Sequence, residues 1–151
     1  MRTIILGIGN EIVKDDGVGI FVAHLLKIVN KNKDVDIETT NSAGIYILDF
    51  IEGYDRAVLI DSIKTEGGEP GNIYEINVRN WNSKEISNSV HTVDVINALT
   101  FYKKHDTRLP DEILLYAVEI GDASGFGEQL TPEVRKSAYT LYIKLKKELS
   151  L

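Results

Sequence analysis

The sequence contains no cysteine among its 151 residues. This absence excludes disulfide bonds, thiolate nucleophiles, iron–sulfur clusters and cysteine-based zinc sites. It is also typical of proteins from a reducing compartment, so we expect a cytoplasmic protein. No apolar run approaches the roughly 18 residues that a membrane span requires, and residues 1–16 become charged too soon for a signal peptide. We therefore expect no membrane insertion.

Basic residues are outnumbered, with 17 Lys and Arg against 23 Asp and Glu and a net charge of -6. An acidic surface argues against a nucleic-acid partner, because that affinity comes largely from Lys and Arg on phosphates. Hydrophobic residues make up 43% of the chain, so a chain of this length can bury a sizeable core without cross-links. These properties predict a single domain over residues 1–151.

Short apolar segments alternate along the chain with segments of helical spacing. The expected strands are Thr3–Ile8, Val35–Thr39, Ala57–Ile60, Asn72–Val78 and Ile113–Val118. The expected helices are Val18–Val29, Ala43–Ile51, Val93–Tyr102 and a last one that Thr131 caps and Pro132 opens. This alternation predicts a three-layer α/β/α fold, in which helices flank both faces of a twisted, mostly parallel, five-stranded sheet.

Ligands of open α/β sheets bind beyond the carboxyl ends of the strands, so polar residues there are candidates for function. Acidic residues follow the first strand at Asp15 and Asp16 and the third strand at Asp61, and His91 precedes the third expected helix. A dinucleotide site is disfavoured, because Ile12 replaces the third glycine of that fingerprint and two carboxylates would repel a pyrophosphate. The sequence also lacks the His-Glu-x-x-His and Gly-x-Ser-x-Gly motifs of zinc proteases and serine hydrolases.

Each candidate also has a purely structural explanation. One of Asp15 and Asp16 could cap the first helix, and Asp61 could form a turn at a strand end. His91 could be an ordinary loop histidine, and His24 is expected at the surface because it lies off the apolar stripe of its helix. If they are functional, two carboxylates and one neutral imidazole could bind nickel, zinc, manganese or iron.

Several motifs, taken in order, resemble those of the nickel–iron hydrogenase maturation endopeptidases. The first two motifs, Gly7-Ile8-Gly9-Asn10 and Asp15-Asp16-Gly17-Val18-Gly19, resemble the N-terminal signature of that family. Later segments that resemble the family are Leu59-Ile60-Asp61, Gly67-Gly68-Glu69-Pro70-Gly71, Ser89-Val90-His91, Val118-Glu119-Ile120-Gly121 and Leu130-Thr131-Pro132-Glu133-Val134. The resemblance therefore spans nearly the whole chain.

The resemblance implies a twisted sheet between helices and an aspartyl-type endopeptidase that activates hydrogenase. Such enzymes remove a C-terminal extension from the hydrogenase large-subunit precursor once nickel is inserted. The nickel-recognising and catalytic residues would be Asp16, Asp61 and His91. The nickel would come with the precursor, other divalent metals could occupy the site in vitro, and we expect a monomer. The expected substrate-binding residues are Gly9, Asn10, Asp15, Gly44, Gly67 and Gly68.

Two departures from the family pattern leave the substrate open. Thr39 and Thr40 stand where several members carry an acid, and Glu11 stands where an apolar residue is common. Two other hypotheses also remain at this stage: a metal- or small-ligand-binding α/β module without peptidase activity, and a scaffold protein in which the acids are only a cap and a turn.

Overall fold

The computed structural model describes residues 1–42, 44–78, 97, 108–121, 127 and 129–151. The expected helix Val93–Tyr102, apart from Asn97, lies outside the described residues, and so does His91. Within the described part of the chain, no helix is both long and apolar enough to cross a membrane.

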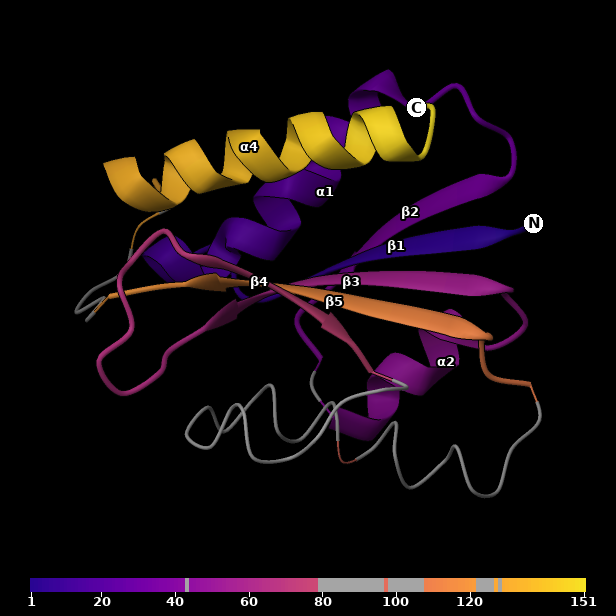
Figure 1. Cartoon of the computed structure of the whole chain (residues 1–151), viewed down its shortest axis with the longest axis horizontal. Coiled ribbons are helices and arrows are strands. Elements are labelled where there is room, and N and C mark those ends of the chain that lie inside the picture. The colour runs from indigo at the N-terminus through magenta and orange to yellow at the C-terminus, as the bar shows by residue number, and fades with distance from the viewer. Residues whose placement is uncertain (43, 79–96, 98–107, 122–126, 128) are drawn as a thin grey trace.

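The described strands form one twisted sheet in the order β2-β1-β3-β5-β4 (Figure 1). Their bounds are Thr3–Ile8 for β1, Val35–Thr40 for β2, Arg56–Ile63 for β3, Ile73–Asn77 for β4 and Glu112–Glu119 for β5. Four strands are parallel and β4 runs antiparallel to β5, so the predicted mostly parallel sheet is confirmed. Several strand bounds differ from the predicted ones by one residue, and the end of β3 differs by three: β3 continues through Ile63, because it keeps pairing with β5 as far as Glu119.

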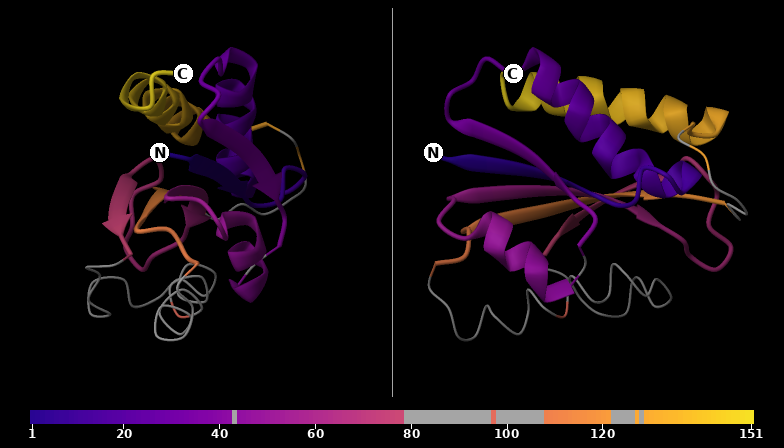
Figure 2. Two further views of the ribbon diagram at one scale, coloured as in Figure 1. Left: turned by 90° about the vertical axis from the view of Figure 1, so that its right-hand side faces the viewer. Right: turned by 180° about the vertical axis from the view of Figure 1, so that it is seen from behind.

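Helices cover both faces of the sheet, as predicted (Figures 1 and 2). Helix α1 (Val18–Val29) and helix α4 (Pro132–Glu148) lie side by side on one face, and the short helix α2 (Ile47–Ile51) lies on the other. The start of the predicted second helix is a 3₁₀ turn, Gly44–Tyr46. Alternate strand residues feed two separate cores, which include Ile5, Val22, Leu26, Val58, Ile60, Tyr116, Val134 and Leu141 on the α1 face and Ile4, Leu6, Ile47, Ile51, Leu59 and Leu115 on the α2 face.

The carboxyl end of β1 is the switch point of this sheet. From β1 the chain runs through α1, on one face, to β2 on one side. It then runs through α2, on the opposite face, to β3 on the other side of β1. A crevice forms at the carboxyl ends of two adjacent strands when the connections that follow them run to opposite sides, and ligands of open α/β sheets bind there. The loop after β1 and the end of β3 therefore form the part of the fold most suited to a site.

Two glycines bring the start of α1 against the sheet at this point. A Cβ atom on Gly19 would lie 2.2 Å from the carbonyl oxygen of Ile60 and 2.6 Å from that of Ile8. A Cβ atom on Gly7 would lie 2.4 Å from the carbonyl oxygen of Gly19. No larger residue fits between these backbones, so the glycines hold the loop before α1 close to both strands.

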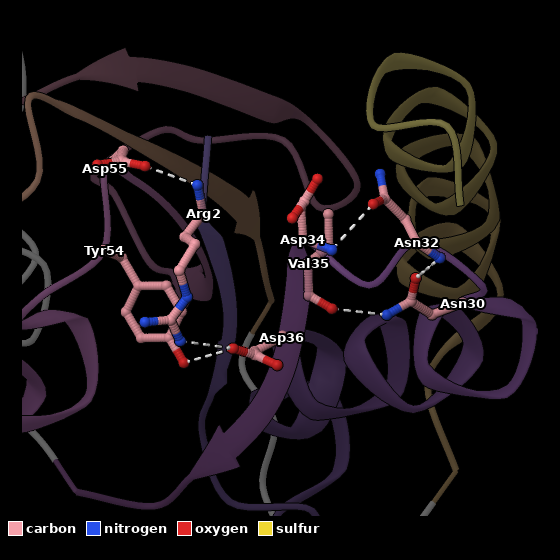
Figure 3. Close-up of polar contacts among 8 residues, drawn as sticks. All are labelled: Arg2, Asn30, Asn32, Asp34, Val35, Asp36, Tyr54 and Asp55. Carbon is pink, nitrogen blue, oxygen red and sulfur yellow. Dashed lines mark hydrogen bonds and ion pairs between the residues drawn. The ribbon is translucent and has the colours of Figure 1, made fainter.

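The opposite edge of the sheet is held together by polar contacts of its own (Figure 3). The Arg2 side chain lies over the Tyr54 ring and pairs with Asp36 at 3.3 Å, and the Tyr54 hydroxyl donates to the same carboxylate at 2.8 Å. The Arg2 backbone N–H donates to Asp55 at 2.6 Å. These contacts join the amino ends of β1 and β2 to the turn before β3, and they give the charged residues of this edge a structural role.

The glycine contact can be tested with Gly19→Ala. Alanine would gain about 1 kcal/mol of helix propensity, but its methyl group would overlap two carbonyl oxygens that belong to the sheet. We expect a net loss of roughly 2–3 kcal/mol in the free energy of unfolding, measured by urea denaturation. Gly121→Ala is the control, because among the described residues the nearest atom to a Cβ there, Pro70 Cγ, is 3.4 Å away. Equal stabilities of the two variants would contradict this account.

Candidate active site at the carboxyl ends of β1 and β3

Asp16 lies in the 3₁₀ turn Lys14–Gly17 that precedes α1, and it bridges the crevice between β1 and β3. Its Oδ1 atom accepts a hydrogen bond from the Ser62 hydroxyl at 2.7 Å. Its Oδ2 atom accepts the backbone N–H of Asn10 at 3.1 Å. The half-buried carboxylate is thus held from both sides, by the loop after β1 and by β3.

Asp61 lies inside β3 rather than after it. Its Cα pairs with that of Ala117 on β5, and the strand continues for two more residues. The side chain is buried, with 5% of its surface exposed, and its Oδ1 atom accepts the backbone N–H of Ser62 at 2.7 Å. The possible turn at a strand end is therefore not what the structure contains. β1 pairs with β3 only as far as Ile60, so Asp61 begins the part of β3 that is open on the β1 side.

The surroundings of Asp61 favour its neutral form. The pKa of its carboxyl is raised from 3.8 to about 7, mainly by burial and to a smaller extent by the negative charge of Asp16. The hydrogen bond from the Ser62 N–H opposes this shift by favouring the charged form. A buried carboxyl beside a second carboxylate is costly unless a proton or a cation compensates it. This pair of acids is therefore suited to exchanging a proton for a cation near neutral pH.

Asp15 has a different task from its neighbour. It is 2% exposed, and its two oxygens accept the backbone N–H and the hydroxyl of Thr131, both at 2.7 Å. Thr131 is the N-cap residue of α4, so the carboxylate lies at the positive end of that helix. The expected helix caps were wrong in detail. Neither Asp15 nor Asp16 caps α1, whose N-cap Gly17 has no side chain, and the Thr131 hydroxyl donates to Asp15 instead of capping α4.

Backbone contacts strengthen this connection between the first loop and the segment before α4. The Lys14 N–H donates to the carbonyl of Gly127 at 2.8 Å, and the Gly127 N–H donates to the carbonyl of Ile12 at 2.9 Å. Val13 and Gly127 form an isolated parallel bridge. The loop that carries Asp16 is therefore fixed at its centre as well as at its ends.

Two of the predicted substrate-binding glycines have close neighbours inside the protein. A Cβ atom on Gly9 would lie 2.0 Å from the carbonyl oxygen of Asp16, so this glycine lets the loop fold over itself. A Cβ atom on Gly68 would lie 1.8 Å from the Oε1 atom of Glu119. Glu119 is 1% exposed and uses that oxygen to accept the backbone N–H and the hydroxyl of Thr65, at 2.8 and 2.9 Å. Glu119 thus anchors the loop between β3 and β4.

The other predicted site residues lie at turns of the same edge or outside the described residues. Gly44 and Gly67 have φ angles of +64° and +73°, in turns after β2 and β3. Asn10 holds Asp16 through its backbone. His91 lies outside the described residues. Within the described residues, no three His, Asp or Glu side chains lie close enough together to hold a metal ion.

A hollow of about 390 Å³ opens beside Asp16, on the β2 side of the loop. Its lining residues are Gly9, Asn10, Glu11, Ile12, Ile20, His24, Thr39, Thr40 and Asn41. They come from the first loop, from α1 and from the end of β2. His24 is exposed, as expected, but it faces this hollow, which its position off the apolar stripe did not predict.

Sequence reasoning also missed Ser62 and the partner of Asp15. Ser62 belongs to no catalytic motif of the sequence, but alternation along an extended β3 places its side chain on the face opposite to that of Asp61, toward α1. The Asp15–Thr131 contact spans 116 residues, and no local pattern can reveal a pairing over that distance. The signal in the sequence was the pair of adjacent acids: a single acid is enough to cap a helix, so the second one indicates another partner or role.

The Asp15 contact predicts a large effect on stability. Asp15→Ala would leave the N–H and hydroxyl of Thr131 without their acceptor in a half-buried place, so we expect a loss of about 2–4 kcal/mol in the free energy of unfolding. Asp15→Asn should lose less, because its amide oxygen can still accept one of the two bonds. Urea denaturation of both variants measures this. A change below about 0.5 kcal/mol in Asp15→Ala, the size expected at a surface position, would refute the role of the contact.

The raised pKa of Asp61 predicts how stability depends on pH. In the unfolded chain the carboxyl titrates near its ordinary value of 3.8, and in the folded protein near 7. Between these values the folded state holds the extra proton, so stability falls as pH rises. Asp61→Asn carries no such proton. The free energy of unfolding of this variant, relative to that of the parent, should therefore rise between about pH 4 and pH 7, by at most about 4 kcal/mol.

This prediction is checked by urea denaturation of both proteins at several pH values between about 4 and 8. Asp34→Asn is the matched control, because Asp34 is exposed in the turn before β2, at the opposite edge of the sheet. Its difference from the parent should stay nearly constant over this range. A constant difference for Asp61→Asn as well would show that the folded-state pKa is not raised.

Comparison with known proteins agrees with this fold. A model of the hydrogenase maturation protease family (HycI) matches residues 20–148, which include Asp61 and α4. The hydrogenase expression/formation protein HupD of Rhizobium leguminosarum bv. viciae is 26% identical over 140 residues, or 89% of this chain and 67% of HupD.

Solved structures extend the similarity to the first loop. The [NiFe] hydrogenase maturation protease HybD from Thermococcus kodakarensis is 25% identical, with a TM-score of 0.73 and 100% of both chains covered. The maturation protease HycI from Thermococcus kodakarensis KOD1 shares the fold at 24% identity, with a TM-score of 0.75 over 99% of this chain and 93% of its own. Because the family model matches well over half of the chain, this protein belongs to the hydrogenase maturation proteases, peptidases whose substrates are hydrogenase large subunits.

Proposed function

We propose that the protein removes a C-terminal extension from the nickel-loaded precursor of a hydrogenase large subunit. Its membership of the maturation protease family supports a peptidase with such a substrate. The observation that carries the proposal is the pair of acids at the switch point, Asp16 held by Ser62 and Asp61 buried in β3 next to Ser62. Both belong to the edge of the sheet that is open to a ligand.

The chemistry of this pair suits a divalent cation that arrives with the substrate. Two carboxylates supply oxygen ligands, and a cation between them would offset the burial and the repulsion from Asp16 that raise the pKa of Asp61. The buried carboxyl would release its proton as the cation binds. In this proposal the nickel of the precursor is part of the substrate, and Asp16 and Asp61 recognise it.

The third expected nickel-recognising residue is His91. An imidazole would add the nitrogen ligand that nickel accepts readily and that the two acids lack. Its role rests on the sequence motif Ser89-Val90-His91. In our proposal it acts with Asp16 and Asp61 to place the scissile peptide beside the ion, where a polarised carbonyl is more easily attacked by water.

Ser62 would act as a positioning residue for this chemistry. Its hydroxyl donates to Asp16 Oδ1, which leaves the remaining lone pairs of that carboxylate for the ligand. Residues that orient a metal ligand typically contribute 10–100-fold to metal affinity or activity. Ser62 is 7% exposed, so its hydroxyl is shielded from competing water.

The proposal is tested by a cleavage assay under anaerobic conditions. Nickel-loaded large-subunit precursor is mixed with the purified protein, and intact mass spectrometry reports the loss of a C-terminal peptide. We expect cleavage by the parent, a decrease of at least about 100-fold for Asp16→Asn and a smaller decrease for Ser62→Ala. The Asp34→Asn control, at the opposite edge of the sheet, should cleave like the parent.

Two outcomes would contradict the proposal. If no cognate precursor is cleaved although nickel is confirmed to be present, the protein is better described as a binding module without peptidase activity. If Asp16→Asn cleaves as fast as the parent, the peptidase activity lies elsewhere in the chain. Urea denaturation of each variant shows whether a lost activity reflects a lost fold.

A further inference from the structure

Large apolar side chains are exposed on the outer surface of α1 and α4, which has no part in the proposed hydrolysis. Ile28 on α1 is 80% exposed, and on α4 Ile143 is 63% and Tyr139 is 45% exposed. Half of the six large apolar side chains that are exposed in the described part of the chain therefore belong to these two helices. Single apolar residues at a surface are ordinary, but neighbouring ones indicate an interaction site.

These side chains form one continuous strip across the two helices. Phe21 and Leu25, both half-buried, share a helix face with Ile28, because the three are spaced by four and three residues. Tyr139 and Ile143 are four residues apart and share a face of α4. The rings of Phe21 and Tyr139 meet edge to face with centroids 5.8 Å apart, which joins the two rows where the helices lie side by side (Figure 2). We call these five residues the apolar strip.

Lysines of α4 border the apolar strip. Lys136 lies three residues before Tyr139. Lys146 and Lys147 follow Ile143 by three and four residues. Residues with these spacings are neighbours on a helix surface, so each apolar residue of α4 in the strip has an ammonium group close to it.

The charge of this face is opposite to that of the whole protein. Helices α1 and α4 together contain six Lys and Arg and two Glu, whereas the whole chain has 17 basic and 23 acidic residues. Two of the six, Lys27 and Lys144, pair with glutamates of the edge strands. The other four belong to α4 and include the three at the border of the strip. The face therefore complements a partner surface that is apolar and carries carboxylates.

The same charges disfavour two other occupants of the strip. In a symmetric dimer built on this face, the lysines of one copy would lie against those of the other, and like charges across an interface are repulsive. An anionic membrane would attract the lysines but repel the rest of a chain whose net charge is -6. An acidic protein surface is the occupant that meets neither repulsion.

We propose that the apolar strip is the docking surface for the folded body of the large-subunit precursor, through a patch of the precursor that is apolar and flanked by carboxylates. The inference rests on the proposed function and deepens it, because it separates recognition of the subunit from recognition of its nickel. Phe21 lies only five residues after Asp16, so the strip begins next to the candidate site. From Phe21 to Ile28 it runs for about 10 Å along α1, away from the carboxyl ends of the strands.

The strip is separate from the hollow beside Asp16. The hollow lies on the β2 side of α1, where Ile20 and His24 line it. The strip lies on the α4 side, where Phe21 meets Tyr139. A precursor could therefore rest on the strip while its extension enters the crevice between β1 and β3.

The test measures the binding of purified, nickel-loaded precursor to strip variants made in the Asp16→Asn background, in which the precursor stays intact. The double variant Ile28→Gln/Ile143→Gln replaces two exposed apolar side chains with a good helix former. We expect its Kd, measured by biolayer interferometry, to rise by at least about tenfold, because burial of two such side chains in an interface is lost.

The charged border is tested by reversing single charges. Lys136→Glu and Lys147→Glu should each raise the Kd by about three- to fivefold at low salt and by less at high salt. Arg108→Glu is the matched control, because Arg108 is exposed and pairs with Glu52 at the end of α2, on the other face of the sheet. Its Kd should be unchanged. With Asp16 restored, cleavage by the strip variants should show a raised KM and an unchanged kcat, as expected when docking alone is weakened.

An unchanged Kd for the isoleucine variant would overturn the proposal, and so would an effect of Arg108→Glu equal to that of the lysine variants. Binding of the parent to phosphatidylserine vesicles, or its self-association in sedimentation, would also overturn it if the isoleucine variant loses that property but still binds precursor. Urea denaturation shows that each variant is folded, and the lysine variants keep the test decisive if the isoleucine variant is not.

The docking surface and the proposed function can fail separately. A parent that binds precursor through the strip but cleaves none would refute the peptidase proposal and retain the docking surface. A parent that cleaves precursor, with strip variants of unchanged KM, would refute the docking surface and retain the peptidase.

Discussion

The site depends on a contact between backbones, the one that brings the start of α1 onto the ends of β1 and β3. Gly19 lies directly against the carbonyl oxygens of Ile8 and Ile60, and Gly7 lies against Gly19. With the helix held this close, the loop before it must fold compactly, and Gly9 lies under the Asp16 carbonyl as a result. The reach of Asp16 to Ser62 on β3 follows from this arrangement. The Asp16 side chain is therefore positioned mainly by packing between backbone atoms.

Three acids within this small region have three different environments. Asp15 has both oxygens hydrogen-bonded to Thr131 and is a structural anion at a helix N-terminus. Asp16 is half-buried and shares its oxygens between Ser62 and Asn10. Asp61 is buried, and its pKa is raised to about 7. Neighbouring carboxyls that differ in burial and in hydrogen-bond partners are typical of sites that use acids for different tasks.

Much of the fold could be predicted because buried helices and strands have characteristic local patterns of apolar residues. Continuous apolar runs marked the strands, and helical spacing marked α1 and α4. The end of β3 was misplaced because Asp61 and Ser62 resemble a strand terminus, and only pairing with β5 shows that the strand continues. The strand-end positions of acids and the family resemblance both led us to expect Asp16 and Asp61 at a site, and the structure brings both to one edge of the sheet.

The parts of the site that were not predicted depend on distant contacts. Capping rules consider a helix and its nearest residues, whereas Asp15 acts on a helix that begins far along the chain. His24 lies off the apolar stripe, which indicates a surface position but not the hollow that two other elements create around it. Packing within the protein already requires a glycine at Gly9 and Gly68, because a Cβ atom at either position would overlap its neighbours.

The Asp15–Thr131 contact also has a consequence for the order in which the protein becomes active. The two residues are 116 positions apart, so during synthesis the first loop leaves the ribosome long before its partner exists. Until α4 forms, the buried carboxylate of Asp15 has no donors, and the loop that carries Asp16 lacks its central support. A nascent chain could therefore build most of the sheet while its acidic site remains incomplete. The proposed acidic site would then be completed only when the last helix docks and Thr131 reaches Asp15.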